Sequence, residues 1–90
     1  MLYMVVEAFR NGDAASVYRR FRDRGRLTPQ GLRYVASWVT QDLRCCYQLM
    51  ECDEPSLFAQ WTKCWEDLIE FQIFPVITSA QAVTAVAGTL

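Results

Sequence analysis

Glu7 is the residue best placed to take part in a reaction, because its carboxyl group lies in the middle of the apolar run LYMVVEAF, residues 2 to 9. A carboxyl group among apolar neighbours is costly to ionise unless it is paired, so burial raises its pKa. Such a group can act as a general acid or base, or orient a ligand. The alternative is a structural role. Glu7 would then form an ion pair with Arg33 or another cross-strand arginine, or lie near the open end of a barrel-shaped sheet where water reaches it. The structural interpretation is the commoner one for an isolated carboxylate, since ion pairs also shift pKa values.

Aromatic and amide side chains on the predicted strands could form a pocket around Glu7. Aromatic walls with a few polar groups are typical of small-molecule sites. Aromatic residues on alternating strands are, however, more often ordinary core. The candidate ligand-binding residues are Glu7, Tyr3, Tyr34, Trp38, Gln48 and Gln72.

The chain has no histidine, which removes the commonest general base, metal ligand and haem ligand. It also has no glycine-rich phosphate loop, no Ser/His/Asp arrangement and no paired-cysteine zinc spacing. Cys45 and Cys46 are adjacent on a predicted strand, so their sulfurs point to opposite faces and cannot easily share one ion. We predict no metal and no cofactor, and the sequence assigns no catalytic residue. Any catalysis must use a carboxylate, a tyrosine or a thiol.

Nine basic and ten acidic residues give a net charge of −1. This balance provides no overall field for nucleic acid or an anionic membrane, and neither partner is predicted. The basic run from Arg19 to Arg26 has no aromatic residues interleaved on its exposed side, and no second basic stripe completes a groove. A solvated helix face explains it better than a phosphate site.

The predicted location is the cytoplasm. The first strand begins at residue 2 with no basic segment before it, so no signal peptide is expected. The longest apolar runs, such as Phe71 to Ile77, fall far short of the about 18 residues needed to span a bilayer. In a reducing compartment the four cysteines are expected to be thiols: Cys45, Cys46, Cys52 and Cys64.

Hydrophobic periodicity predicts one domain over residues 1–90 with four strands and three helices. Alternation with a period of two indicates the strands, and apolar spacings of three and four residues indicate the helices. Pro75 favours an edge position for the last strand, because proline cannot donate to the sheet. The strands are predicted at Leu2–Phe9, Leu32–Val39, Arg44–Cys52 and Glu70–Thr78. The first helix is predicted at Ala14–Arg24. The second is predicted to begin after an N-cap at Asp53 and to extend to Leu68, and the third to begin after an N-cap at Ser79 and to end near Gly88.

This order is βαββαβ with a short C-terminal helix appended. Right-handed crossovers then give an α+β, ferredoxin-like sandwich with a four-stranded antiparallel sheet and both long helices on one face. The first and third strands lie in the middle. That position agrees with the run from Leu2 to Phe9, which is mostly apolar on both sides and therefore needs cover on both.

The uncovered face of such a sheet is also apolar, in a chain that is 52% hydrophobic. An apolar sheet face of roughly 800 Å² per subunit is about what a standard specific interface buries, and it is large for a monomer. Packing two such faces about a two-fold axis closes a barrel. We therefore predict a homodimer through the open sheet face.

Four segments carry a family resemblance: MLYMVVEAFRNGD, VYRRFRDRGRLTPQGLRYVASWV, YQLMECD and WTKCWEDLIEFQIFPVITSAQA. Together they span about the whole chain, which resembles a family of short bacterial proteins catalogued as domain of unknown function 3303. The resemblance implies a dimeric α/β barrel and assigns no activity. The chain departs from the family pattern at Cys45, Cys46 and Cys64, so the resemblance gives these thiols no role.

Three functions fit these features. The first is a homodimeric domain that binds a small apolar or aromatic molecule in a pocket beside the sheet. The second is a cofactor-independent monooxygenase or isomerase in which Glu7 is the acid or base and Tyr3, Tyr34 or Trp38 orients the substrate, by analogy with metal-free monooxygenases of this fold. The third is a structural or interaction module with a filled barrel. A cavity of about 300 Å³ or more beside Glu7 would favour the first two.

Overall fold

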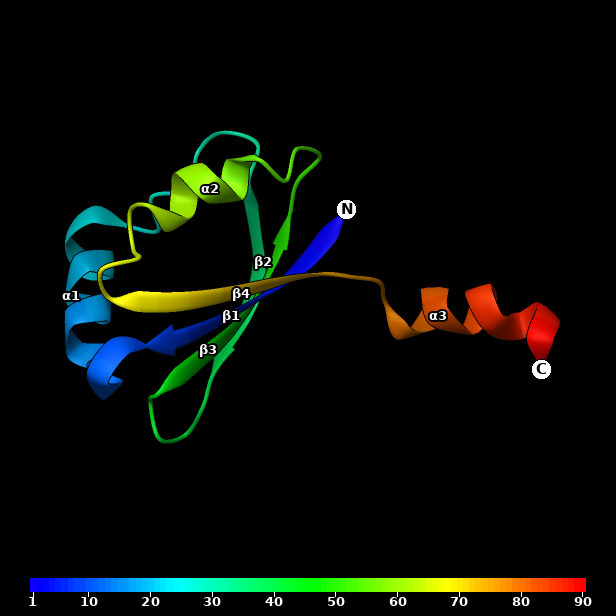
Figure 1. Ribbon diagram of the computed structural model, residues 1–90, viewed down its shortest axis with the longest axis horizontal. Coiled ribbons are helices and arrows are strands. Elements are labelled where there is room, and N and C mark those ends of the chain that lie inside the picture. The colour runs from blue at the N-terminus through cyan, green and yellow to red at the C-terminus, as the bar shows by residue number, and fades with distance from the viewer.

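Strand β1 (Leu2–Phe9) lies at the centre of the molecule in the computed structural model, which describes residues 1–90 (Figure 1). It pairs with β3 (Cys45–Glu51) on one side and β4 (Ile69–Val76) on the other, and β2 (Arg33–Val39) pairs with β3. All pairs are antiparallel, and the strand order is β2-β3-β1-β4. The predicted central and edge strands are confirmed. Pro75 lies in the edge strand β4.

One face of the sheet is covered by α1 (Ala14–Arg24) and α2 (Leu57–Thr62) (Figure 1). A short 3-10 turn, η1 (Arg10–Gly12), joins β1 to α1. The bounds of β1 and α1 are those predicted, because Asp13 caps the helix by accepting from the Ser16 N–H at 3.1 Å and Gly25 ends it at φ 74°. The α+β architecture with its antiparallel four-stranded sheet is consistent with a ferredoxin-like fold.

Helix α2 is shorter than the sequence predicts. It begins at Leu57, with Ser56 rather than Asp53 preceding it, and ends at Thr62. The chain from residue 63 to 68 continues in turns in which the Trp65 N–H bonds to Thr62 and the Ile69 N–H bonds to Trp65. Such turns keep apolar side chains on one side, so the periodicity holds although the helix has ended.

A β-bulge interrupts β2 between Tyr34 and Ala36. Tyr34 pairs with Met50, whose side chain is fully buried under the helices, whereas Ala36 and Trp38 pair with residues of the open face. Regular alternation along β2 would place Tyr34, Ala36 and Trp38 on one face. Tyr34 instead lies on the opposite face from the other two, because the extra residue of a bulge reverses the alternation.

The core lies between the helices and the covered face of the sheet. Its fully buried side chains are Trp61, Met50, Val5 and Cys52. Aromatic rings connect the layers: Tyr3 of β1 meets Phe58 of α2 with centroids 5.1 Å apart. The odd-numbered residues of β1 point into this core.

The other face of the sheet is open and mostly apolar in its middle. Two adjacent cross-strand rows consist of Trp38, Tyr47, Val6 and Gln72, and of Ala36, Leu49, Met4 and Phe74. Charged residues lie at its two ends, with the Arg33–Glu51 ion pair at one end and Glu70 at the other. Trp38 is 59% exposed and Phe74 is 49% exposed. We call these two rows the open-face rows.

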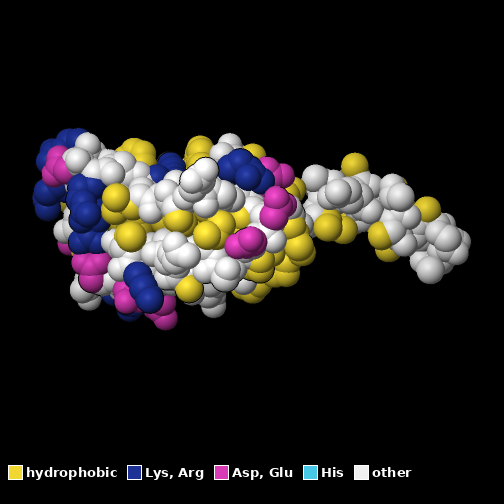
Figure 2. Space-filling model, turned by 90° about the horizontal axis from the view of Figure 1, so that it is seen from above, with side chains coloured by type: hydrophobic (Ala, Val, Ile, Leu, Met, Phe, Trp, Pro, Cys, Tyr) yellow, Lys and Arg dark blue, Asp and Glu magenta, His cyan; other side chains and the backbone are white.

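The C-terminal helix α3 (Ser79–Val86) and the turn η2 (Ala87–Thr89) project away from the domain (Figure 1). Thr78, not the predicted Ser79, caps α3 in a capping box with Gln81. No charged residue follows Glu70, and Figure 2 shows only apolar and neutral side chains on this arm. Ile77, Val83 and Val86 remain exposed along it.

The helices of this fold are too short or too polar for any of them to cross a bilayer. All four cysteines are free thiols.

Candidate functional site

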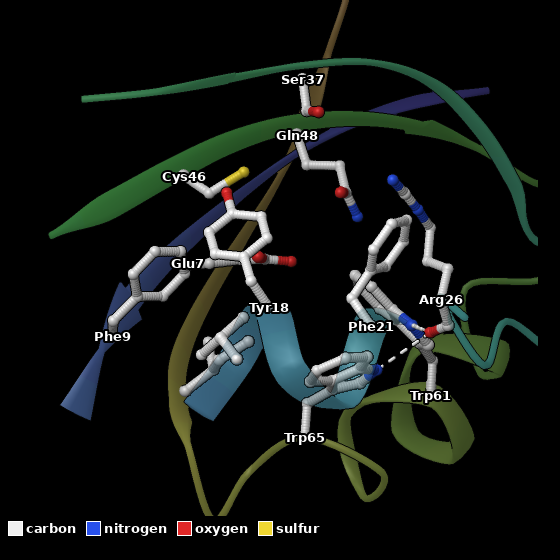
Figure 3. Close-up of a pocket in the computed structure, with 12 residues that line it drawn as sticks. Glu7, Phe9, Tyr18, Phe21, Arg26, Ser37, Cys46, Gln48, Trp61 and Trp65 are labelled. Carbon is white, nitrogen blue, oxygen red and sulfur yellow. Dashed lines mark hydrogen bonds between the residues drawn. The ribbon is translucent and has the colours of Figure 1, made fainter. Parts of the chain in front are cut away.

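A cavity of about 100 Å³ lies between α1 and the covered face of the sheet (Figure 3). Eight of its twelve lining residues are hydrophobic, and the other four are Glu7, Arg26, Ser37 and Gln48. Tyr18 and Phe21 of α1 are both partly exposed beside it, so the cavity communicates with the surface. Its volume is below the about 150 Å³ that accommodates a benzene molecule in an engineered apolar cavity. It is also below the about 300 Å³ typical of ligand pockets, so the volume alone does not favour a ligand, and the case for one depends on the polar side chains that line the cavity.

Glu7 reaches the cavity from the middle of β1 and is only 6% exposed. Burial raises the pKa of Glu7 from its ordinary value of 4.5 to about 7, although the positive charge of Arg26 and a hydrogen bond from Cys46 oppose the rise. Glu7 forms no salt bridge: Arg33 binds Glu51 instead, with Nε and Oε1 3.2 Å apart. The carboxyl group therefore titrates near neutral pH and is available to a proton donor or acceptor in the cavity.

Cys46 lies directly opposite Glu7 in the strand pairing. Burial first, and then the negative charge of Glu7, raises the pKa of the Cys46 thiol to about 12. Tyr18 approaches the same two groups from α1, and burial is the main cause of its raised pKa. Both side chains remain protonated at neutral pH. Cys46 is therefore not a thiolate nucleophile in this setting.

Arg26 enters the cavity from the loop after α1, and its backbone is held tightly. Its carbonyl oxygen accepts hydrogen bonds from the Nε1 atoms of Trp61 and Trp65, each at 2.9 Å (Figure 3). The chain reverses at Gly25, with φ 74°, and at Leu27, with φ 65°, a value that leucine adopts only under strain.

The Arg26 guanidinium lies against two aromatic rings. Its Cζ atom is 3.8 Å from the centre of the Tyr34 ring and 5.1 Å from that of Phe21. Cation–π contacts of this kind hold the charge in place. They satisfy no N–H group, however, and the buried Nη1 atom has no hydrogen-bond partner.

Gln48 extends into the cavity from β3 and is 4% exposed. Its Nε2 atom lies 3.3 Å from the Met50 sulfur, which is a weak acceptor. Figure 3 shows the Gln48 amide, the Arg26 guanidinium and the Glu7 carboxyl group entering the same space from three parts of the chain. The site therefore combines an acid, a cation and an amide within apolar walls.

The structure brings together only some of the candidate residues. Glu7 and Gln48 line the cavity, and Tyr34 adjoins it through Arg26. Tyr3 lies on the same side of the sheet but packs in the core against Phe58. Trp38 and Gln72 lie in the open-face rows, on the opposite side from Glu7.

Sequence reasoning missed Arg26, which it assigned to a solvated basic run. For Arg22 that assignment agrees with the structure, since its side chain is 71% exposed. The Arg20 side chain is only 24% exposed, and it donates to Asp67 and to the Cys64 carbonyl oxygen. The one available signal was Gly25, because a chain reversal after a helix turns the next residue back toward the domain. Trp61 and Trp65 are core residues, and they also border the cavity.

Comparison with known proteins identifies the family. The model of the domain of unknown function DUF3303 matches residues 1–90, so the chain belongs to this family. No curated protein matches the chain, and no solved structure matches it.

Proposed function

We propose that this member of the DUF3303 family binds a small, largely apolar molecule in the cavity between α1 and the sheet. The observation that carries the proposal is a cavity with mostly hydrophobic walls into which two buried polar side chains, Glu7 and Gln48, project. Both an unfilled cavity and a buried carboxyl group without a salt bridge destabilise a core, so their occurrence together favours a binding role. The volume of about 100 Å³ limits the enclosed part of the ligand to a few non-hydrogen atoms.

Binding can be tested with protein purified from its own host. Native mass spectrometry under gentle conditions should show a co-purified small molecule, and the same spectrum reports the oligomeric state. Glu7→Gln should weaken retention of that molecule, whereas Glu70→Gln, the same change at an exposed position on β4, should not. A bare protein in every preparation would favour the third function, an interaction module with a filled barrel.

A second candidate is a cofactor-independent isomerase or monooxygenase in which Glu7 moves a proton. The specific support is the pKa of Glu7, about 7, which suits a general acid or base at neutral pH. Deuterium exchange into the carbon beside the carbonyl group of a small ketone such as acetone would test proton abstraction. Exchange should rise with pH as Glu7 ionises and should vanish in Glu7→Gln. Equal rates in wild type and Glu7→Gln would eliminate this candidate.

The proposed assembly is a homodimer in which the open-face rows of two chains pack together and close an α/β barrel. An apolar centre with charged ends is the usual anatomy of a specific interface, and the rows between Glu70 and the Arg33–Glu51 pair have this pattern. The projecting α3 arm would then lie against the partner, where its exposed valines find cover. Sedimentation at micromolar concentration should give twice the mass of one 10.4 kDa chain.

The proposed location is the cytoplasm. Its support is the set of four free cysteines, a pattern that suits a reducing compartment.

A further inference from the structure

The Nη1 atom of Arg26 is the one buried side-chain nitrogen or oxygen in the molecule that lacks a hydrogen-bond partner. Leaving a buried charged donor unpaired is costly, and native proteins contain few such groups. Nearby acidic groups do not resolve it, because no salt bridge involves Arg26. A ligand in the adjoining cavity that accepts a hydrogen bond from Nη1 would account for this unpaired donor.

Arg26 is also held in place before any ligand arrives. Trp61 and Trp65 fix its carbonyl oxygen, and Tyr34 and Phe21 flank its guanidinium. The strained φ of Leu27 is maintained in the same loop. Strain and rigid support of this kind are common where a side chain must be presented to a binding partner.

The chemistry of a guanidinium restricts what its partner can be. It offers only donors, in a planar fork that matches the two oxygens of a carboxylate. The Gln48 amide, now beside a weakly accepting sulfur, offers a second donor to the same cavity. Apolar walls around these donors suit the hydrocarbon part of an organic acid.

We propose that the cavity binds a small organic anion whose carboxylate accepts hydrogen bonds from Arg26 Nη1 and that Glu7 takes up a proton when this anion binds. The identity of the ligand as an anion rests on the proposed binding function. The apolar part of the ligand lies against Phe21 and Trp65 at the cavity wall.

Proton uptake follows from the charges around Glu7. The titratable or charged groups that face it are Cys46 from β3, Tyr18 from α1 and Arg26 from the loop after α1. None of the other eight cavity-lining residues is ionisable: Phe9, Val17, Phe21, Ser37, Gln48, Trp61, Trp65 and Ile69. Arg26 is thus the single positive charge in the site. An anion that occupies it would face an ionised Glu7 without compensation, and protonation of Glu7 removes that repulsion.

The test compares acids with their neutral amides on the whole chain. Propionate and propionamide, and butyrate and butyramide, are titrated into isotopically labelled protein at pH 6 and pH 8, with binding followed by NMR shifts of the indole and backbone N–H groups. At pH 6 each acid should bind at least about tenfold more tightly than its amide. Between pH 6 and 8 the affinity for the acid should fall up to about tenfold, while that for the amide stays constant.

Variants then assign the effect to Arg26 and Glu7. Arg26→Met should abolish the preference for the acid, and Arg24→Met, at the exposed end of α1, should retain it. Arg26→Lys keeps the charge but loses the planar fork, so an intermediate preference is expected. Glu7→Gln should bind the acid with no dependence on pH.

Two results would overturn the inference, and they differ in whether the proposed binding function is refuted as well. Equal affinities for acid and amide in the wild type would refute anion recognition but leave an apolar binding site in place. Failure of all four probes to bind more tightly than about 10 mM would remove the binding site itself. The comparison of acid with amide needs no variant, so it holds even if Arg26→Met does not fold.

Discussion

The two faces of the sheet are built by the same strands and yet have opposite characters. On β1, the side chains of Val5 and Glu7 point under the helices, while those of Met4 and Val6 point outward. The covered face places its few polar groups deep inside, around a cavity. The open face keeps an apolar centre and places its charges at the ends. This difference is the basis for proposing a small ligand at the covered face and a second subunit at the open face.

The largest expected effect is on association through the open face. Phe74→Glu places a carboxylate within the proposed apolar interface, where an unpaired charge costs several kcal/mol. We expect the dimer to dissociate at least about 1000-fold more readily, about 4 kcal/mol, with the fold retained because Phe74 is already half exposed in a single chain. Analytical ultracentrifugation measures the change. Leu43→Glu, on the turn between β2 and β3, is the matched control and should remain dimeric.

The covered face should show itself through the pH dependence of stability. The folded-state pKa of Glu7 is raised from 4.5 to about 7, so the folded chain binds a proton more tightly than the unfolded chain. Its contribution is therefore fully present below about pH 4.5 and is lost as pH rises through 7, a change of about 3 kcal/mol. Urea denaturation from pH 5 to pH 9 should show this loss in the wild type and not in Glu7→Gln. Parallel curves for the two proteins would contradict the assignment.

A tryptophan on each face provides the next comparison. Trp61→Phe removes one of the two hydrogen bonds to the Arg26 carbonyl oxygen and part of a buried ring, and should destabilise the fold by about 2 kcal/mol. Trp38→Phe, at an exposed position, should change the stability of the isolated chain by less than about 0.5 kcal/mol. Thermal or urea unfolding at low protein concentration measures both. Equal losses would mean that the open face is as well packed as the covered one within a single chain.

The smallest change in stability is expected at Leu43, which adopts a left-handed backbone conformation in the turn between β2 and β3 and belongs to neither face of the sheet. Leu43 has φ 61° and is exposed, so Leu43→Gly relieves strain and should stabilise the fold by up to about 1 kcal/mol. Leu27 has a similar φ of 65° but packs against the core. Leu27→Gly should therefore destabilise, since lost packing exceeds the relief of strain. Chemical denaturation should give opposite signs for the two variants.

Most of the fold could be predicted because its signals are local. Alternation in LYMVVEAF identifies β1 and both of its faces, and Asp13 and Gly25 mark the ends of α1. The spacing of Trp61 and Trp65 located the second helical region correctly but not its end, because tight turns preserve the same apolar spacing as a helix. The bulge after Tyr34 has no such signal, since the extra residue is an ordinary valine.

The site was only partly predictable, because it depends on residues distant in the sequence. Glu7 was identifiable as a carboxylate in an apolar strand. Arg26 was not, since it belongs to a run in which Arg22 and Arg24 do lie at the surface. What separates Arg26 from them is the pair of indole N–H groups some 35 and 39 residues later that hold its carbonyl oxygen. A contact of that range is set by tertiary packing.

The three tryptophans are intrinsic fluorescent probes of both faces of the sheet, because two lie in the core under the covered face and one lies on the open face. Two indoles share the Arg26 carbonyl oxygen, so any displacement of that loop changes their hydrogen bonding and hence the wavelength of their emission. The third, Trp38, faces water in a single chain and should be open to collisional quenchers such as acrylamide. Spectral shifts and quencher access therefore separate occupancy of the interior from contact between subunits, without an added label.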